Sequence, residues 1–390
     1  MVWPSVTITQ LNTFGGVTKS IERALLFVGA AAANQGTVVP VIASSDLDAL
    51  FGNADCALKN EIAAFFKNAG QGAFCYAAVM TAGESSPPED GEFPMQGALL
   101  FDWRPAIRRA QAQVSVEGVI ITAPVSTQEE IQAAQELRTE INNALGRWLW
   151  FALPVAGIDD ETETWAEYTE KLTALQQGIA APQVQLVPTF FGNEIGVLAG
   201  RLCNAAVTIA DSPARVATGP LQGLKNLDKP IDSAGKPLDL ATLQALARMR
   251  YSVPMWYADY DGLYWADGAT LEVEGGDYGV IENVRVVDKA ARRIRIMAIP
   301  KVANRILNST QGSIAAHELL FGKPLREMAK SVQIGGVTFP GEIRPPKDGD
   351  VKITWPEASK AAINFIIRPY NCPKEITTGI MLDTGQENNV

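Results

Sequence analysis

The sequence predicts a two-lobed protein of mixed α/β and α+β class, with extended β-arms at both termini. Short apolar runs alternate with amphipathic helical stretches in the first half, which indicates a mixed, largely parallel sheet flanked by helices. A turn-rich stretch follows, and segments with period-two alternation lie near both termini. We expect this division: N-terminal arm 1–16, α/β lobe 17–215, linker 216–238, α+β lobe 239–370 and C-terminal arm 371–390.

The first lobe combines apolar runs of strand length with capped helices. The stretch from Thr127 to Leu145 begins with a Thr cap, carries glutamates in its first turn and ends at Gly146. A shorter helix follows Ser44 or Ser45, either of which is a natural N-cap. The predicted strands are Leu25–Val28, Val38–Ile42, Phe74–Val79, Val119–Ile121, Trp148–Leu153 and Val184–Val187.

The second lobe begins with a helix capped by Asp239. Asp261-Gly262 stands between two aromatic runs, which predicts a hairpin turn whose aromatic side chains pack in the core or, alternatively, form a ligand platform. A helical region follows from Tyr278 to Asn308, kinked near Pro300. Further helices are predicted at Ile314–Phe321 and Pro324–Val332, and strands at Val351–Trp355, Ile363–Arg368 and Glu375–Leu382.

Composition narrows the possible functions. The chain has 390 residues, 47% of them hydrophobic, and a net charge of -10, which argues against wrapping of nucleic acid as the main task. Its longest apolar run, Ala24 to Ala33, is about half the length of a membrane span. We therefore expect a soluble protein made inside a cell, without membrane insertion. The cysteines have no metal or redox spacing, and Cys75 and Cys203 are expected to be buried.

The sequence has no motif typical of a catalytic, cofactor or metal site. It has one histidine, His317, which we interpret as a polar helix-face residue rather than a general base. No nucleophile elbow, dinucleotide fingerprint or phosphate loop is present, so we expect no enzyme activity, cofactor or metal. Two basic groups are either solvated helix faces or contacts for an acidic partner. They are Lys289, Arg292, Arg293 and Arg295, and Lys323, Arg326 and Lys330.

The order of several segments resembles contractile tail sheath proteins of myoviruses and R-type pyocins. The matching segments are the arm "PSVTITQLNT", the strand "ALLFVGAA", the strand and helix "TVVPVIASSDLDALFG", the segment "GLYWADGATL" and the ending "INFIIRPYNCPKEITTGIMLD". The likeness runs from end to end. Where those sheaths carry Trp-Gly-Asn-Arg, this chain has Trp265-Ala266-Asp267-Gly268, so no role of that Asn-Arg pair is carried over.

The resemblance implies a structural subunit that polymerises through its arms. In such sheaths, arm strands join a small sheet of neighbouring subunits. Hinges would lie at Gly15, Gly16, Pro369 and Pro373. The arm residues would be Val6, Thr7, Ile8, Thr9, Ile376, Thr377, Thr378, Ile380, Met381 and Leu382.

The implied assembly is a stack of hexameric rings that forms a helical sleeve around a tail tube and contracts to drive the tube through the host envelope. Tail tube, baseplate and tail terminator proteins would be partners, and Lys323, Arg326 and Lys330 would contact the tube. The subunit would belong to the virion and be assembled in the host cytoplasm. Alternatives are the sheath of a non-viral contractile machine, or an α/β enzyme that uses the switch point of the first-lobe sheet.

Overall fold

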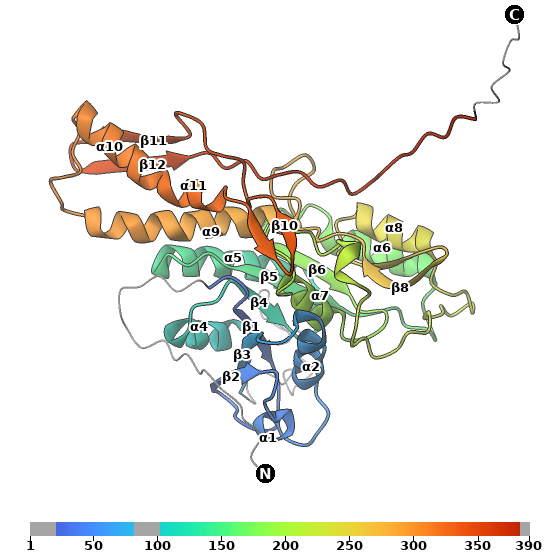
Figure 1. Cartoon of the computed structure of the whole chain (residues 1–390). Coiled ribbons are helices and arrows are strands. Elements are labelled where there is room, and N and C mark those ends of the chain that lie inside the picture. Colours follow the sequence, from blue (N-terminus) through green and yellow to red (C-terminus); the bar gives the residue numbers. More distant parts are fainter. Residues whose placement is uncertain (1–20, 82–101, 383–390) are drawn as a thin grey trace, which may run out of the picture.

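The computed structural model describes residues 21–81 and 102–382. The predicted N-terminal strand Val6–Thr9 and the hinge glycines Gly15 and Gly16 lie outside these residues. Figure 1 shows a sheet with helices beside it, a long helix above this layer, and a small two-stranded sheet next to the long helix. The chain then leaves the body as an extended segment.

The central sheet has the strand order β2-β3-β1-β4-β5-β6. Only β2 runs antiparallel to its neighbour; the other pairs are parallel. The mixed, largely parallel sheet predicted from the apolar runs is therefore confirmed. Its strands are β1 Leu25–Gly29, β2 Val38–Ile42, β3 Phe74–Val79, β4 Gly118–Ile121, β5 Trp150–Val155 and β6 Val184–Pro188.

Helices cover both faces of this sheet. Side chains alternate across β1, so Leu26 belongs to one hydrophobic core and Phe27 to the other. The first core is closed by α4, α5 and α6, and the second by α2 and α7. The helices are α1 Leu47–Phe51, α2 Ala57–Ala69, α4 Arg104–Gln113, α5 Gln128–Leu145, α6 Trp165–Gln176 and α7 Glu194–Leu202.

Helix ends largely follow the cap signals in the sequence. Thr127 forms the predicted capping box, with Glu130 as its partner, and α5 ends at Gly146 in the left-handed conformation. The predicted cap of α1 was wrong. Asp46, rather than Ser44 or Ser45, caps this helix, because its carboxylate accepts the N–H groups of Asp48 and Ala49.

Residues 216–238, the predicted linker, contain the short 3₁₀ helix η1 (Val216–Thr218) and contact the first lobe. Leu221 and Leu238 are buried in the two cores of the central sheet. The Leu221 N–H also donates to the Leu263 carbonyl at 2.8 Å. The division of the chain into a lobe, a linker and a second lobe stays a prediction.

The aromatic hairpin forms, but its turn differs from the predicted one. Helix α8 (Leu240–Arg248) precedes strands β7 (Pro254–Tyr257) and β8 (Tyr260–Trp265), and Tyr257 pairs with Tyr260. The turn is therefore Ala258-Asp259, where Asp259 adopts a φ of 57°. Gly262 lies inside β8 instead. A Cβ there would come within 2.7 Å of Pro220, so this glycine permits a close approach.

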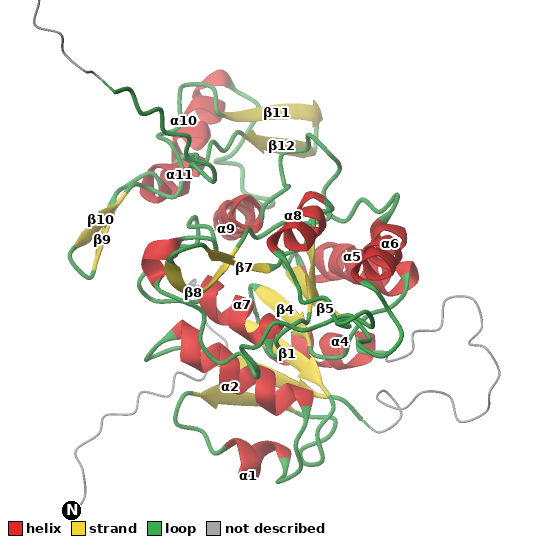
Figure 2. Cartoon of the chain, turned by 90° about the vertical axis from the view of Figure 1, so that its right-hand side faces the viewer, coloured by secondary structure: helices red, strands yellow, loops and turns green. Residues whose placement is uncertain are grey.

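The C-terminal part packs around a third core that joins α9, α11 and β11. Figure 2 shows α9 between this part and the central sheet. The elements are α9 Ile281–Ala298, η2 Ile299–Lys301, α10 Gln311–Phe321, α11 Lys323–Met328, β9 Val332–Ile334, β10 Val337–Phe339, β11 Val351–Glu357 and β12 Lys360–Phe365.

Several predicted bounds in this part were wrong. The long helix ends at Ala298 and passes into the 3₁₀ turn that contains Pro300, so it does not continue to Asn308. Val332 begins a hairpin strand instead of ending a helix, because Gly335 and Gly336 both adopt positive φ and form the turn. The range 375–382 has no regular structure within this chain; the strand predicted there was expected to pair with a neighbouring subunit, so it stays a prediction.

Candidate functional site

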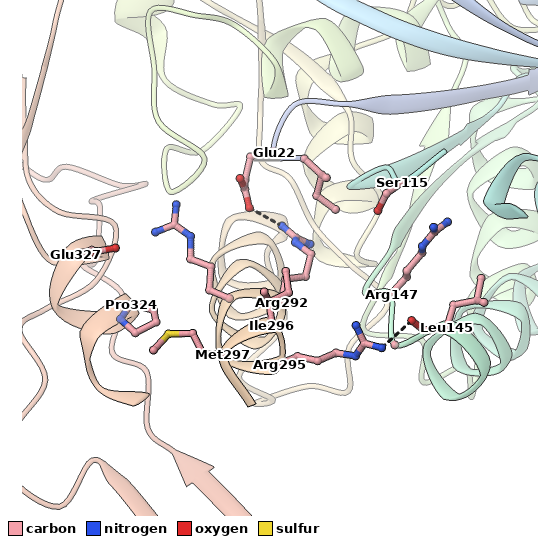
Figure 3. A pocket seen from close by; sticks show the side chains of 13 residues that line it. Glu22, Ser115, Leu145, Arg147, Arg292, Arg295, Ile296, Met297, Pro324 and Glu327 are labelled. Carbon is pink, nitrogen blue, oxygen red and sulfur yellow. Dashed lines mark hydrogen bonds and ion pairs between the residues drawn. The ribbon is translucent and has the colours of Figure 1, made fainter. Parts of the chain in front are cut away.

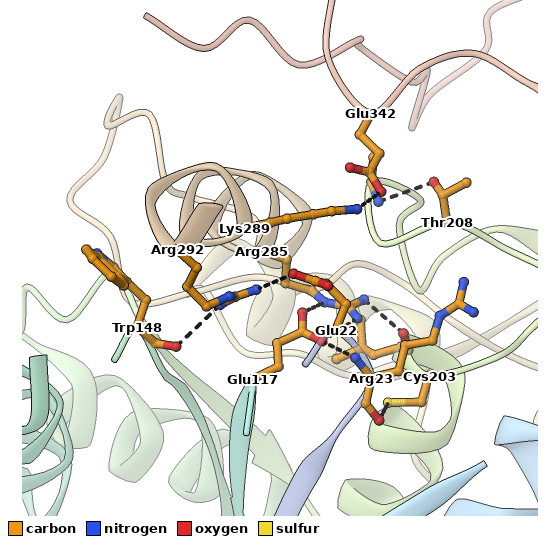
Figure 4. Close-up of polar contacts among 12 residues, drawn as sticks. Glu22, Arg23, Glu117, Trp148, Cys203, Thr208, Arg285, Lys289, Arg292 and Glu342 are labelled. Atoms are coloured by element: carbon orange, nitrogen blue, oxygen red, sulfur yellow. Dashed lines mark hydrogen bonds and ion pairs between the residues drawn. The ribbon is translucent and has the colours of Figure 1, made fainter. Parts of the chain in front are cut away.

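Near the start of the described chain lies a cluster of charges, which we call the N-terminal root: Glu22, Arg23, Glu117, Arg285 and Arg292 (Figure 4). Its last three members are buried. Arg285 on α9 makes a two-pronged ion pair with Glu117 beside β4, with Nε–Oε1 and Nη2–Oε2 distances of 2.5 and 3.1 Å. The side chain of Arg285 is 1% exposed and that of Glu117 is fully buried. The backbone N–H of Arg23 donates to the same carboxylate.

Glu117 and Arg285 form an ion pair although both are buried, because neighbouring groups compensate for the loss of contact with water. Burial raises the pKa of Glu117, but Arg285, Arg292 and the Arg23 N–H outweigh it and hold the pKa below its ordinary value. Arg285 also donates to the Leu202 carbonyl at 2.9 Å. This charged pair therefore joins α9 to the start of the interior strand β4 and to Arg23, near the beginning of the described chain.

Two members of the first basic group take part in similar contacts. Arg292 donates to Glu22 at 3.1 Å, and Lys289 is paired with Glu342. Both cations are nearly buried. The interpretation of this group as a solvated helix face is therefore wrong for these two residues, because carboxylates distant in sequence cover them.

The C-terminal arm begins at a second cluster, the C-terminal root: Asp267, Glu282 and Lys374. The Lys374 ammonium donates to Glu282 Oε1 at 2.7 Å and also to Asp267. Lys374 and Asp267 are 30% and 31% exposed, so water reaches this cluster. The preceding link is held as well, because Arg368 pairs with Asp350 at 2.8 Å and residues 343 and 369 form a β-bridge.

In the C-terminal root, the pKa of the buried carboxylate shifts in the opposite direction to that of Glu117. Burial raises the pKa of Glu282, and the attraction of Lys374 offsets this only in part, so the pKa stays above its ordinary value. Burial lowers the pKa of Lys374, but Glu282 and Asp267 outweigh it and the pKa is raised. Glu282 also has a buried Oε2 without a hydrogen-bond partner in the described residues.

Both roots are attached to one helix. Glu282 lies in the first turn of α9, and Arg285 and Arg292 follow on the same helix. Ten residues separate Glu282 from Arg292, a distance of about 15 Å along the helix axis. Helix α9 thus connects the two roots as one continuous element.

Beyond Lys374 the chain is exposed and apolar. Ile376, Ile380, Met381 and Leu382 are 77%, 94%, 95% and 87% exposed. Figure 1 shows this segment running away from the body without touching it. Within the described part of the chain, no other residues bury the side chains that are predicted to form the C-terminal arm strand.

The two-stranded sheet β11–β12 has unpaired edges in the described structure. Ile353 on β11 lies opposite Ile363 on β12, and the Ile353 N–H points outward and donates to Glu318 Oε1 of α10 at 2.9 Å. The antiparallel pattern directs the Ile363 backbone groups to the other edge in the same way. Glu318 thus occupies one edge, and β12 leaves its own edge open.

The second basic group lies on the short helix α11 and beyond it. Lys323, Arg326 and Lys330 are all exposed, and Arg326 donates to the Leu319 carbonyl at 2.6 Å. No carboxylate pairs with any of the three among the described residues. Their contact with a partner stays a prediction.

The groups that could perform chemistry are buried or scattered. His317 is 5% exposed, its Nδ1 lies 2.8 Å from the Ser313 carbonyl, and its ring lies beside that of Phe321 in the third core, so it is a buried residue of α10. Cys75 and Cys203 are buried, as expected, and burial raises the pKa of both thiols. Among the described residues, no group of three acidic, cysteine or histidine side chains could hold a metal. Nor does any described helix have the length and apolar character of a membrane span.

Family models match most of the chain. The model described as DUF2586, N-terminal domain, matches residues 3–269, and DUF2586, C-terminal domain, matches residues 277–385. The chain belongs to the DUF2586 family. The two matches meet on the C-terminal side of the linker predicted at 216–238.

The proteins that resemble this chain carry names of sheath proteins. It is 47% identical over 386 residues to a protein of Haemophilus phage HP1 (strain HP1c1) whose name assigns it provisionally to the tail sheath, with 98% of both chains covered. The PVC sheath complex of an extracellular contractile injection system, in its contracted state, has a TM-score of 0.59 at 14% identity over 98% of both chains. A sheath tail protein of Listeria innocua has a TM-score of 0.54 at 9% identity, covering 90% of this chain and 93% of its own.

These findings confirm the predicted resemblance to contractile tail sheath proteins and the predicted role as a structural sheath subunit. Sequence reasoning missed the two roots. Glu22 and Glu117 lie 270 and 168 residues away from their arginine partners, so no local pattern points to these pairs. The only available signal was the concentration of arginines along one helix.

Proposed function

We propose that this sheath subunit polymerises by donating its terminal arms to neighbouring subunits. The observation that carries the proposal is the exposed segment Ile376–Leu382, which presents apolar side chains and unpaired backbone outside the body. Such a segment is costly in water and is satisfied by pairing with a sheet edge. The N-terminal residues Val6–Thr9 have the alternation to act in the same way.

The acceptor is the β11–β12 sheet of a neighbour. Strand β12 spans Lys360–Phe365, which is close to the length of the arm segment Ile376–Leu382. Its outer edge is unpaired in the described residues, and β11 is held in place by the third core. A donated strand at β12 would turn the two-stranded sheet into a wider one, which is more stable than an isolated hairpin.

Donation of an arm to a different surface of the next copy is a heterologous contact, which builds rings or open helices. We propose hexameric rings stacked into a sleeve around a tail tube, with baseplate and tail terminator proteins at its ends. Hinges at Gly15, Gly16, Pro369 and Pro373 would let the subunits rotate as rigid bodies while the arms hold. The sleeve would then shorten and widen, and drive the tube through the host envelope.

The tube contact is assigned to Lys323, Arg326 and Lys330, which are exposed cations without carboxylate partners in the described chain. The proposed role is structural and not enzymatic. The subunit would act in the virion tail after assembly in the host cytoplasm. The likeness to an extracellular contractile injection system also supports a second candidate, the sheath of a non-viral contractile machine.

Removal of each arm tests the proposal. Variants lacking residues 1–12 or 375–390 should keep the thermal unfolding transition of the full chain but form no sleeves in negative-stain electron microscopy, with tube and baseplate proteins present as nuclei. The full chain in the same mixture is the control. Long sleeves from either truncated variant would overturn the arm mechanism.

A further inference from the structure

A pocket of about 530 Å³ lies between α5, α9 and α11, and four arginines line it (Figure 3). They are Arg147, Arg292, Arg293 and Arg295. Among the described residues, the lining has two carboxylates, Glu22 and Glu327, and Glu22 is already paired with Arg292. The pocket therefore carries an excess of positive charge in a protein whose net charge is -10.

Arg147 and Arg295 are held in place by carbonyl groups, which do not neutralise them. Arg147 donates to the Val114 carbonyl at 2.7 Å, and Arg295 donates to the Leu145 carbonyl at 3.1 Å. Burial lowers the pKa of Arg147, and the neighbouring Arg295 lowers it further. Arg292 is 8% exposed, and its Nε has no hydrogen-bond partner among the described residues. Fixed guanidinium groups with spare donors fit carboxylates well.

We infer that this arginine-lined pocket binds the acidic end of the C-terminal arm, residues 383–390, of a second copy of the chain. That segment reads Asp-Thr-Gly-Gln-Glu-Asn-Asn-Val, with two carboxylates at Asp383 and Glu387 and no lysine or arginine. Its charge is thus complementary to the pocket. Ile21, Leu145 and Ile296 add an apolar part of the lining that suits the Val390 side chain.

The position of the pocket favours a second copy as the donor. The arm leaves the body where Lys374 meets Glu282, in the first turn of α9, whereas the pocket surrounds Arg292 to Met297 near the other end of that helix. The described arm also runs away from the body (Figure 1). Donor and acceptor therefore lie on different surfaces, as a heterologous contact requires.

The inference rests on the proposed arm donation and extends it. An arm strand paired with β12 of a neighbour would end beside the third core, against which both Ile363 and the pocket residue Met297 pack. The eight residues from 383 to 390 can span about 26 Å when extended. The arm strand would then supply the backbone pairing, and the segment beyond it would supply charge recognition.

Charge reversal in the full chain tests the inference. Arg293→Glu, and separately Asp383→Lys with Glu387→Lys, should each raise the protein concentration needed for sleeve formation about tenfold. The combination of both changes should restore it to within about threefold of the original. Arg305→Glu is the matched control, because it makes the same charge change on an exposed residue that does not line this pocket. It should leave the threshold unchanged.

A direct binding measurement complements the assembly assay. A fluorescent, C-terminally amidated peptide of residues 379–390 should bind the full chain below its assembly threshold. Binding should weaken about tenfold when Asp383 and Glu387 are replaced by Asn and Gln, and again with Arg293→Gln, a milder change in case Arg293→Glu disturbs folding. Equal binding of both peptides would overturn the inference.

The two proposals can fail separately. If deletion of 375–390 abolishes sleeves while Asp383→Lys with Glu387→Lys leaves them intact, the arm mechanism stands and the pocket inference is wrong. If deletion of 375–390 leaves sleeves intact, the arm mechanism itself fails, and the pocket inference fails with it.

Discussion

The N-terminal root and the C-terminal root join the arms to the same helix in different surroundings. In the N-terminal root, Glu117 and Arg285 are sealed from water and share two hydrogen bonds. In the C-terminal root, Lys374 is 30% exposed and pairs with the buried Glu282 and with Asp267, which is 31% exposed. Because solvent weakens exposed ion pairs, the first root is built to stay closed and the second can open and close.

The largest difference between the roots should appear when one carboxylate is neutralised. Glu117→Gln leaves Arg285 buried without a counter-charge, so we expect the free energy of unfolding to fall by about 3–5 kcal/mol. Urea denaturation followed by circular dichroism measures this. The double variant Glu117→Leu with Arg285→Met should recover much of the loss, because it removes both charges together. A loss of less than about 1 kcal/mol for Glu117→Gln would contradict the assigned role of this pair.

The matching change at the C-terminal root should be mild. Lys374→Met should lower the free energy of unfolding by less than Glu117→Gln does, because Asp267 is partly exposed and the buried Glu282, whose pKa is already raised, can take up a proton once Lys374 is gone. It should instead loosen the start of the arm, which a spin label on the exposed Cys372 reports as faster motion, with Cys56 replaced by Ser. Unchanged label motion would show that Lys374 does not hold the arm.

Acidification should break the ion pairs of the two roots at different pH values, and we expect this effect to be smaller than those of the substitutions. The pKa of Glu282 lies above its ordinary value of 4.5, whereas that of Glu117 lies below it. As the pH falls, Glu282 therefore takes up a proton first and loses its ion pair with Lys374. The stabilising contribution of Glu117 is present above pH 4.5 and is lost only as the pH falls through its lowered pKa.

The Cys372 label should accordingly gain mobility with a midpoint above pH 4.5, before circular dichroism reports unfolding. Glu282→Gln is the control, and its label mobility should no longer depend on pH in this range. A single transition shared by the label and the unfolding signal would mean that the roots do not respond separately.

Sequence reasoning predicted the parts of the fold that local patterns determine. The strands of the central sheet were found because each is a short apolar run, and α5 because Thr127 and Gly146 mark its ends. Helices α4 and α7 were missed. Helix α4 is short and polar on one side, and α7 contains Gly196 and Gly200, which look unfavourable for a helix but allow its backbone to approach α2.

The roots could not be predicted because they depend on tertiary contacts. The sequence shows Lys289, Arg292, Arg293 and Arg295 as one basic group, yet the structure buries Lys289 and Arg292 against carboxylates and places Arg293 and Arg295 at a pocket. Spacing along a helix indicates which residues share a face. It does not indicate which distant carboxylate will cover that face.

The hydrogen bond between Glu318 and the Ile353 N–H has a consequence for the timing of assembly. Any strand that pairs with the β11 edge must first displace this carboxylate, so each such addition carries an activation barrier. A freshly synthesised subunit thereby resists premature aggregation at that edge. An arm that pairs with the open β12 edge meets no such barrier, so pairing at β12 would precede any pairing at the β11 edge.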